Sequence, residues 1–549
     1  NNPTIYDPRT NKENTIKRRN KILKDMYEQK LIRKDQYEEA INEEINVKSA
    51  QKSKTEKKNY VETYVIHCAT KEIMKQKGFE FKYDFSSTSE KKKYQEEYDK
   101  MYAECKRTLY SAGYHIYTSI DPDVQKQLQS SVDNALSGYT EKDKNGIYKT
   151  QASGTCIDND TGKVVAIVGG REQKNIGYTL NRAFQSPRQP GSAIKPLLVY
   201  APALEHGWSA GSTVNDSPMS TKDKNRVRNS HGSYSGQISL RRAVQKSSNV
   251  ATMRIYEQLT PKTCLKYLEE MNFKYLTDSD YTTCIGGFTK GTTSEEMAAG
   301  YATLKNDGVY REPTCISKIT TSDGDEVMSS STKKRRVYST NAANAMTDVL
   351  KSVVTGGTGV GAKVPNVDTA GKTGTTDAYN DLWFVGYTPY YTCAVWSGYD
   401  NNEKLPEDAR NFHKNLWKKV MTRIHEGLED RDFDMPASVD KISVCEETGL
   451  LPRAGCPVIT EYFDIGDVPT DYCDQHFYES DDTMEEHTTE EATFELSPTP
   501  DPNNPDGDNT GDNTGDNTGD NTGDNTGDNT GDNTGDNTGD NTGDNTGDN

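Results

Sequence analysis

Apolar side chains stand three and four positions apart near the start of the chain, the spacing of one helix face. They are Ile22, Leu23, Met26 and Tyr27. Residues 34–45 predict a second helical segment. Residues 48–112 are rich in Lys and Glu, with one apolar patch at 60–68. This pattern predicts a helical, polar connector that is partly solvated.

The pattern changes at residue 114, where the largest part of the chain begins. Apolar residues before Asp121-Pro122 predict a strand, and Leu128 and Val132 predict a helix after it. Residues 154–170 alternate around an Asp-Asn-Asp-Thr-Gly turn, which predicts two strands joined tightly. Helical and strand patterns then mix to about residue 421, as expected of an α/β or α+β domain.

The last part of the chain differs in composition. Residues 436–478 are turn-rich and contain cysteines, and residues 479–549 are acidic and dominated by Gly-Asp-Asn-Thr repeats. The repeats have almost no apolar residues, so this tail is predicted to be disordered. It carries much of the net charge of -18. The remainder has no basic face interleaved with aromatic residues, which speaks against nucleic-acid binding.

Ser192 and Lys195 are the first candidates for chemistry. Pro190-Gly191 predicts a loop, and the apolar run 197–204 predicts a helix, which places Ser192 at a helix start with Lys195 one turn on. A buried Lys can be the base that a Ser nucleophile needs. Other Ser-x-x-Lys matches lie in polar, Lys-rich stretches, which indicates chance. These are Ser49/Lys52, Ser89/Lys92, Ser330/Lys333 and Ser331/Lys334.

A second motif, Ser247-Ser248-Asn249, follows the amphipathic stretch 238–244. On its own it reads as a polar junction between a helix and a loop. Several motifs together carry more weight than one, because short motifs match by chance.

The third motif lies in residues 370–376, just before the apolar run 381–387, which predicts a strand. On its own it reads as a Gly-rich turn. As a strand edge, it would present the charge of Lys372 and the hydroxyls of Thr373 and Thr375. That combination suits a peptide that ends in a carboxylate.

Together and in this order, the three motifs match the Ser-x-x-Lys, Ser-x-Asn and Lys-Thr-Gly set. With their flanks, such as GQISLRRAVQKSSNV at 236–250 and TTSEEMAAGYATLKNDG at 292–308, they resemble the transpeptidase domain of class A penicillin-binding proteins. The resemblance covers about residues 110–480. It implies an α/β fold of the α+β type, in which helices flank an antiparallel sheet.

The start of the chain, NNPTIYDP, looks like the end of the peptidoglycan glycosyltransferase domain of the same family. In that family the catalytic glutamates lie upstream, so no such residue is assigned here. No run of 18 apolar residues occurs. We therefore expect a fragment whose parent carries a membrane anchor upstream and works on the extracytoplasmic face of a bacterial membrane. The expected parts are 1–47 (glycosyltransferase remnant), 48–112 (connector), 113–435 (transpeptidase), 436–478 (Cys-containing module) and 479–549 (tail).

The resemblance also implies roles for individual residues. Ser192 would attack the carbonyl between the two terminal D-alanines of a peptidoglycan stem peptide, and Lys195 would take its proton. Ser247 and Asn249 would relay protons and hold the substrate amide, and Lys372 would face the terminal carboxylate. The other substrate-binding residues would be Thr373, Gly374 and Thr375. The N–H groups of residues 192 and 375 would hold the oxyanion.

A second stem-peptide amine would then resolve the acyl-enzyme, and a β-lactam would remain attached to Ser192. No metal or cofactor is needed for this reaction. Two alternatives stay open. Water could replace the amine, as in a D,D-carboxypeptidase or β-lactamase on the same fold, or the chain could be a non-enzymatic penicillin sensor. The glycosyltransferase remnant favours the synthase, and the intact Ser192/Lys195 pair argues against an inert site.

Two local features qualify the resemblance. Pro202 falls inside the expected helix after Lys195 and predicts a kink. Trp383, Phe384 and Tyr387 could line a cleft, although core packing is the favoured interpretation for aromatic residues in such a strand.

The C-terminal module contains Cys445, Cys456, Cys473 and His476. Four Cys and His ligands could form a closed zinc site. A disulfide with a spare thiol is the favoured interpretation, because the module should lie outside the membrane and the intervals are longer than in a paired Cys-x-x-Cys motif. Three unpaired cysteines in a turn-rich module are the remaining alternative. In either case the module is predicted to be structural.

Overall fold

A computed structural model of the chain describes residues 5–47, 59–83, 85, 87–172, 180–220, 227–275, 280–329, 333–434, 439–464 and 468–476. The predicted disordered tail lies outside these residues. Among the described residues, no helix is both long and apolar enough to cross a membrane.

Two helices near the start confirm the helical periodicity of this segment. They are α1 (Lys12–Glu28) and α2 (Lys34–Asn42), and neither has a buried residue. Tyr27 and Tyr37 stack with ring centroids 5.1 Å apart. Arg19 donates hydrogen bonds to the Ile41 and Glu43 carbonyls. The two helices therefore form a helical hairpin, and this ring stacking and these hydrogen bonds hold its two arms together.

The predicted connector is helical, but its first helix is less solvated than expected. Helix α3 (Tyr60–Gln76) begins at a capping box made by Asn59 and is followed by α4 (Thr88–Ser111). Tyr64 and Met74 of α3 are fully buried in the main core. Lys71 pairs with Glu312 at 2.8 Å, and Lys75 pairs with the same carboxylate. Although its sequence is rich in Lys, helix α3 therefore packs on the large domain.

A five-stranded antiparallel sheet organises this domain, in the order β10-β11-β12-β2-β3. Every neighbouring pair in it is antiparallel. The strands are β10 (Ala370–Thr375), β11 (Asp381–Tyr387), β12 (Tyr391–Tyr399), β2 (Thr150–Asp158) and β3 (Val164–Val168). The third motif is therefore an edge strand, as one of its two interpretations predicted. The hairpin β2–β3 confirms the strand-turn-strand pattern.

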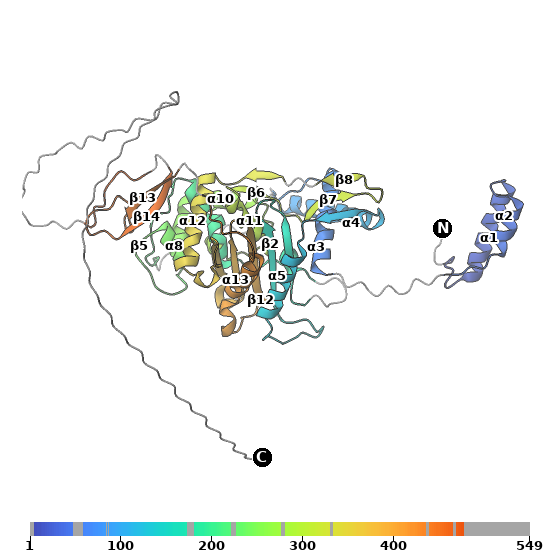
Figure 1. The fold of residues 1–549 in the computed structure, drawn as a ribbon, viewed down its shortest axis with the longest axis horizontal. Helices are drawn as coiled ribbons and strands as arrows, with labels where there is room; N and C mark the ends of the chain where they lie inside the picture. Colours follow the sequence, from blue (N-terminus) through green and yellow to red (C-terminus); the bar gives the residue numbers. More distant parts are fainter. Residues whose placement is uncertain are drawn as a thin grey trace, which may run out of the picture. The chain divides into compact units, whose positions relative to one another are not determined.

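Helices cover both faces of this sheet (Figure 1). On one face lies α11 (Ser294–Lys305), which shares a hydrophobic core with Trp383 and Val385 of β11. On the other lie α5 (Pro122–Ala135) and α13 (Phe412–Ile424), against Phe384. Successive residues of β11 thus enter opposite cores, as the two-residue period of a strand requires. Trp383, Phe384 and Tyr387 are buried, so core packing is confirmed for them. Helices flanking an antiparallel sheet confirm the α+β class.

Smaller elements surround this centre. The additional strands are β1 (His115–Thr118), β7 (Ile316–Thr320) and β8 (Glu326–Ser329) in one sheet, and the pairs β4 (Thr213–Asn215) with β5 (Gln237–Ser239) and β6 (Val309–Arg311) with β9 (Lys334–Arg336). The additional helices are α6 (Arg182–Gln185), α8 (Leu240–Lys246), α9 (Asn249–Leu259), α10 (Pro261–Glu270) and α12 (Thr340–Gly356). Short helical turns are η3 (Tyr281–Ile285), η4 (Val360–Ala362), η5 (Asp377–Tyr379) and η6 (Glu407–Asn411).

The C-terminal module is a hairpin of β13 (Val439–Cys445) and β14 (Val458–Asp464). One ion pair attaches it to the large domain. Arg241 of α8 donates to Glu461 of β14, with Nε 2.6 Å from Oε1, and also pairs with Asp348 of α12. The Glu461 side chain is 0% exposed. A carboxylate buried this completely needs its cation, so the pair fixes the hairpin on α8.

Candidate active site

Ser192 lies in a single turn of 3-10 helix, η1 (Gly191–Ile194), and is partly exposed. The chain continues as one turn of π-helix, η2 (Pro196–Tyr200), and then as α7 (Ala201–Glu205). The sequence predicted one kinked helix here, and the structure has three short helical pieces instead. Pro202 has no N–H for the carbonyls one turn earlier. Tyr338 supplies a donor, with its hydroxyl 2.7 Å from the Leu197 carbonyl oxygen.

The turn that carries Ser192 contacts strand β10 through main-chain atoms. A Cβ on Gly374 would lie 2.2 Å from the Pro190 oxygen, and one on Gly191 would lie 2.6 Å from the Thr375 oxygen. Gly191 also has φ of +51°, where side chains are disfavoured. Only glycine fits at both positions. The two glycines bring the third motif against the nucleophile turn.

Lys195 is fully buried, and its amine faces the second motif. Its Nζ donates to the main-chain oxygens of Ser247 at 2.9 Å and Ser248 at 3.1 Å, and to Asn249 Oδ1 at 2.7 Å. Burial lowers the pKa of the Lys195 amine to about 7. An amine with this pKa is divided between charged and neutral forms at neutral pH, and the neutral form can accept a proton.

Lys372 approaches the same segment from strand β10. Its Nζ donates to Ser247 Oγ at 2.8 Å and to the Thr373 carbonyl at 3.1 Å. Burial, followed by the charge of Lys195, holds the pKa of the Lys372 amine well below its ordinary range. Ser247 itself ends α8 in the left-handed conformation, with φ of 55°. The structure thus brings two lysines from separate motifs to Ser247. Lys195 contacts its main-chain oxygen, and Lys372 contacts its side-chain hydroxyl.

Two residues that the sequence did not single out hold the second motif in place. Asn229 Oδ1 accepts from the Asn249 N–H at 2.9 Å, and its amide donates to Asp216 Oδ1 at 2.8 Å. The Asp216 carboxylate also accepts from the Ser248 hydroxyl at 2.5 Å. Both residues stand in an irregular, polar part of the chain, where no periodicity or spacing marks them.

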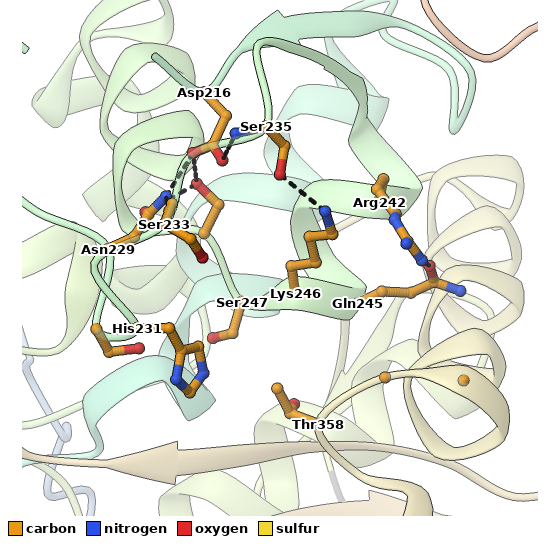
Figure 2. Close-up of a pocket in the computed structure, with 14 residues that line it drawn as sticks. Asp216, Asn229, His231, Ser233, Ser235, Arg242, Gln245, Lys246, Ser247 and Thr358 are labelled. Atoms are coloured by element: carbon orange, nitrogen blue, oxygen red, sulfur yellow. Dashed lines mark hydrogen bonds between the residues drawn. The ribbon is translucent and has the colours of Figure 1, made fainter. Parts of the chain in front are cut away.

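A polar pocket of about 430 Å³ opens beside this segment (Figure 2). Ser247, His231, Lys246 and Thr358 are among the residues that line it. Thr358 Oγ1 lies 2.9 Å from Thr373 Oγ1, so the pocket wall is hydrogen-bonded to strand β10. The pocket can therefore accept a polar ligand that also runs along the strand edge.

The remaining candidates fall in different places. Gly374 is buried, Thr373 is half-buried and Thr375 is exposed on β10. Trp383 Nε1 donates to the Gln189 oxygen at 2.8 Å and so holds the loop before Ser192. Among the other Ser-x-x-Lys matches, Ser89/Lys92 lies exposed on α4. Ser49/Lys52, Ser330 and Ser331 lie outside the described residues.

The chain is similar to known proteins in both sequence and fold. Residues 152–422 match the penicillin-binding protein transpeptidase domain, and residues 435–478 match the C-terminal domain of penicillin-binding protein 1A. The chain is 32% identical to penicillin-binding protein 1A of Clostridium perfringens over 511 residues, 86% of this chain and 59% of that protein. It is 32% identical to penicillin-binding protein 4 of Bacillus subtilis over 77% of this chain and 65% of that protein. The chain thus spans about six-tenths of the length of these relatives.

Solved structures show the same fold. The crystal structure of penicillin-binding protein 1A from Haemophilus influenzae is similar with a TM-score of 0.61 and 20% identity, covering 85% of this chain and 84% of that one. PonA1 from Mycobacterium tuberculosis in complex with penicillin V is similar with a TM-score of 0.56 and 23% identity, covering 69% of this chain and 97% of that one. The matched domains and relatives, on a fold that brings the three motifs together, show that the chain belongs to the class A penicillin-binding proteins.

Proposed function

We propose that this chain is a serine D,D-transpeptidase that crosslinks peptidoglycan stem peptides and is acylated by β-lactams at Ser192. The observation that carries the proposal is the buried Lys195 amine, one helical turn from Ser192, with a pKa lowered to about 7. An ordinary surface lysine would be almost entirely protonated at neutral pH and could not serve as a base. The family relationship supports the same reaction class.

In the first step, Lys195 takes the Ser192 proton as Oγ forms a bond to the carbonyl carbon between the two terminal D-alanines. Lys195 must release one of its three hydrogen bonds to accept this proton. The N–H groups of residues 192 and 375 stabilise the oxyanion. The C–N bond then breaks. The leaving D-alanine nitrogen receives the proton that Lys195 took from Ser192, relayed by the Ser247 hydroxyl. The product is an ester on Ser192.

In the second step, the amine of a neighbouring stem peptide attacks this ester. Its surplus proton returns through Lys195 to Ser192 Oγ as the ester bond breaks, which regenerates the enzyme. Lys372, with Thr373 and Thr375 of the same strand, faces the terminal carboxylate of the donor peptide. Asn249 holds the amide of the same peptide. Water in place of the amine would give a carboxypeptidase or β-lactamase from the same ester.

The parent protein is proposed to add glycan polymerisation and a membrane anchor, in residues upstream of this chain. That places the reaction on the extracytoplasmic face of a bacterial membrane. The glycosyltransferase-like start of the chain supports this proposal. The four-ligand module at the C-terminus takes no part in the acyl transfer.

The decisive experiment is covalent labelling with a fluorescent penicillin. The parent chain should be labelled at one site, and Ser192→Ala should abolish the label. Ser89→Ala is the matched control, since Ser89 belongs to a Ser-x-x-Lys match on an exposed helix, and it should be labelled normally. Persistent labelling of Ser192→Ala would disprove the assignment. A D-amino acid acceptor added with a peptide donor then separates transfer from hydrolysis.

A further inference from the structure

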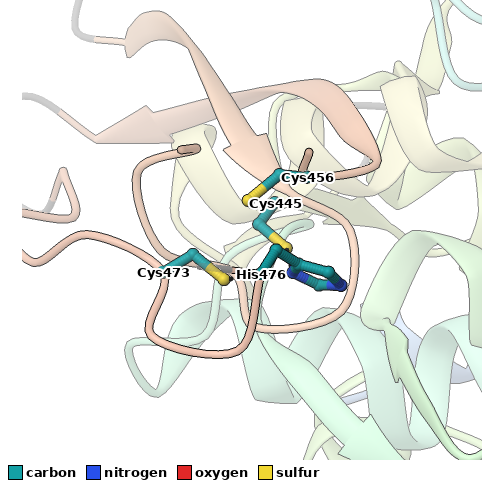
Figure 3. Close-up of side chains that lie close together, drawn as sticks. All are labelled: Cys445, Cys456, Cys473 and His476. Carbon is teal, nitrogen blue, oxygen red and sulfur yellow. Dashed lines mark hydrogen bonds between the residues drawn. The ribbon is translucent and has the colours of Figure 1, made fainter. Parts of the chain in front are cut away.

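The C-terminal module gathers four potential metal ligands that the acyl-transfer reaction does not use. Cys445, Cys456, Cys473 and His476 each offer one ligand atom, and these atoms all lie within 4.8 Å of one another. His476 Nδ1 is 3.2 Å from Cys473 Sγ and 3.5 Å from Cys445 Sγ. Figure 3 shows the four side chains gathered from the end of β13, the turn before β14 and the segment 468–476. All three cysteines are free thiols, although sequence reasoning favoured a disulfide.

We propose that these residues bind one structural Zn²⁺ as a closed Cys₃His site. In tetrahedral zinc sites Zn–S bonds of about 2.3 Å and Zn–N bonds of about 2.0–2.1 Å place the ligand atoms roughly 3.5–3.8 Å apart. The two separations from His476 Nδ1, 3.2 and 3.5 Å, lie close to this range, and all four ligand atoms lie within 4.8 Å of one another. Four protein ligands leave no open coordination position, so the site is structural. On binding, three thiols release their protons to solvent, and three Zn–S bonds and one Zn–N bond form.

The surroundings of the ligands support a metal over a disulfide. Glu447 Oε2 lies 3.2 Å from His476 Nε2, so the second ring nitrogen can donate to a carboxylate and leave Nδ1 free to bind the ion. The Arg453 N–H lies 3.2 Å from Cys456 Sγ, as expected of a donor that stabilises a metal-bound thiolate. A disulfide would use two of the three thiols and leave the third thiol and the oriented imidazole without a role.

The backbone already holds the ligands in place. Cys445 ends β13, and its N–H donates to the Leu450 oxygen at 2.8 Å to close a tight turn. The Cys473 N–H donates to the Leu451 oxygen at 2.8 Å. Apart from such backbone contacts, residues 468–476 belong to no helix or longer strand in the described part of the chain. Zinc would tie this segment to the β13–β14 hairpin, which the Glu461 pair fixes on α8.

Elemental analysis of the full chain, purified without chelator from zinc-supplemented cells, tests the proposal. We expect about one zinc per chain, and less than one-tenth for Cys445→Ser and Cys473→Ser. Cys264→Ala is the matched control, because Cys264 is buried in α10 away from the cluster, and it should keep its zinc. Glu447→Gln should weaken zinc affinity by about 10- to 100-fold, the usual effect of removing such a partner.

Two further measurements do not depend on the folding of variants. Metal-free parent protein, titrated with Co²⁺ under reducing conditions, should develop the sulfur-to-cobalt charge-transfer absorption and visible bands of tetrahedral thiolate coordination at one equivalent. In denaturant with chelator and without reductant, all ten cysteines should react with a thiol reagent. Failure of the reduced protein to bind Co²⁺ or Zn²⁺ would overturn the proposal. So would a zinc-free protein with two fewer reactive thiols, which indicates a disulfide.

Discussion

The pH dependence of acylation is the sharpest consequence of the buried Lys195. With a pKa of about 7, half of the amine is neutral at pH 7. The neutral fraction falls to roughly one-eleventh at pH 6 and roughly one-hundredth at pH 5, whereas a lysine at about 10.4 would be only about one part in 2,500 neutral at pH 7. The second-order rate of acylation should therefore fall about tenfold per pH unit below 7.

The assay is stopped-flow acylation by a fluorescent penicillin between pH 5 and 9. Lys195→Ala should slow acylation by about 10²–10⁴ and remove the acid limb, because the titrating base is gone. Lys246→Ala is the matched control. Lys246 stands next to Ser247 but is exposed, with its amine 2.7 Å from Ser235 Oγ, so the limb should not move.

Two results would refute this reasoning. A rate that stays level down to pH 5 would show that no group with a pKa near 7 must lose a proton. A rate for Lys195→Ala within about threefold of the parent would assign the base to another residue. The sign of the pH dependence follows from burial. Burial disfavours the charged amine, which lowers its pKa and makes the base available at neutral pH.

Three further predictions concern the surroundings of the site. Lys372→Ala should weaken recognition of carboxylate-bearing substrates more than that of a carboxylate-free analogue, and an equal loss for both in competition assays would contradict its role. Gly374→Ala forces a methyl group to within 2.2 Å of the Pro190 oxygen, so penicillin acylation should slow about 10- to 100-fold, in line with about 1–3 kcal/mol of overpacking; an unchanged rate would mean that the turn and the strand separate freely. Glu461→Gln should lower the free energy of unfolding, measured with denaturant, by about 1.5–3 kcal/mol, because it removes charge-assisted hydrogen bonds from Arg241, which keeps Asp348 as a partner; an unchanged transition midpoint would contradict the anchoring role of the pair.

Local patterns predicted which candidate side chains come together better than they predicted the residues that hold them in place. The motif residues Ser192, Lys195 and Lys372 came from short, ordered segments whose neighbours also matched a known family, and the hairpin β2–β3 came from simple alternation. Asn229 and Asp216 were missed because their importance lies in hydrogen bonds to a segment about twenty or more residues away. No spacing rule encodes such contacts.

The sequence also failed to indicate that a lysine-rich helix is partly buried. The lysines of helix α3 make its sequence look polar. Lys71, however, forms an ion pair with Glu312, which is 241 positions further along the chain. A sequence window cannot see that partner, so it assigns the lysine to solvent. The π-helical turn after Lys195 was missed for a similar reason, since the hydroxyl that serves its carbonyl comes from Tyr338. In both cases a distant side chain changes what the local pattern means.

The main-chain contact between the nucleophile turn and strand β10 also constrains how the protein can evolve. At Gly191 and Gly374 the smallest substitution adds a methyl group against a carbonyl oxygen, so no graded series of side chains exists there. In the proposed enzyme, such a change would harm the stem-peptide reaction and the β-lactam reaction alike, because both use the same turn. We therefore expect variants that distinguish the antibiotic from the natural substrate at exposed residues that line the pocket, such as His231 and Lys246, because exposed substitutions usually change stability little.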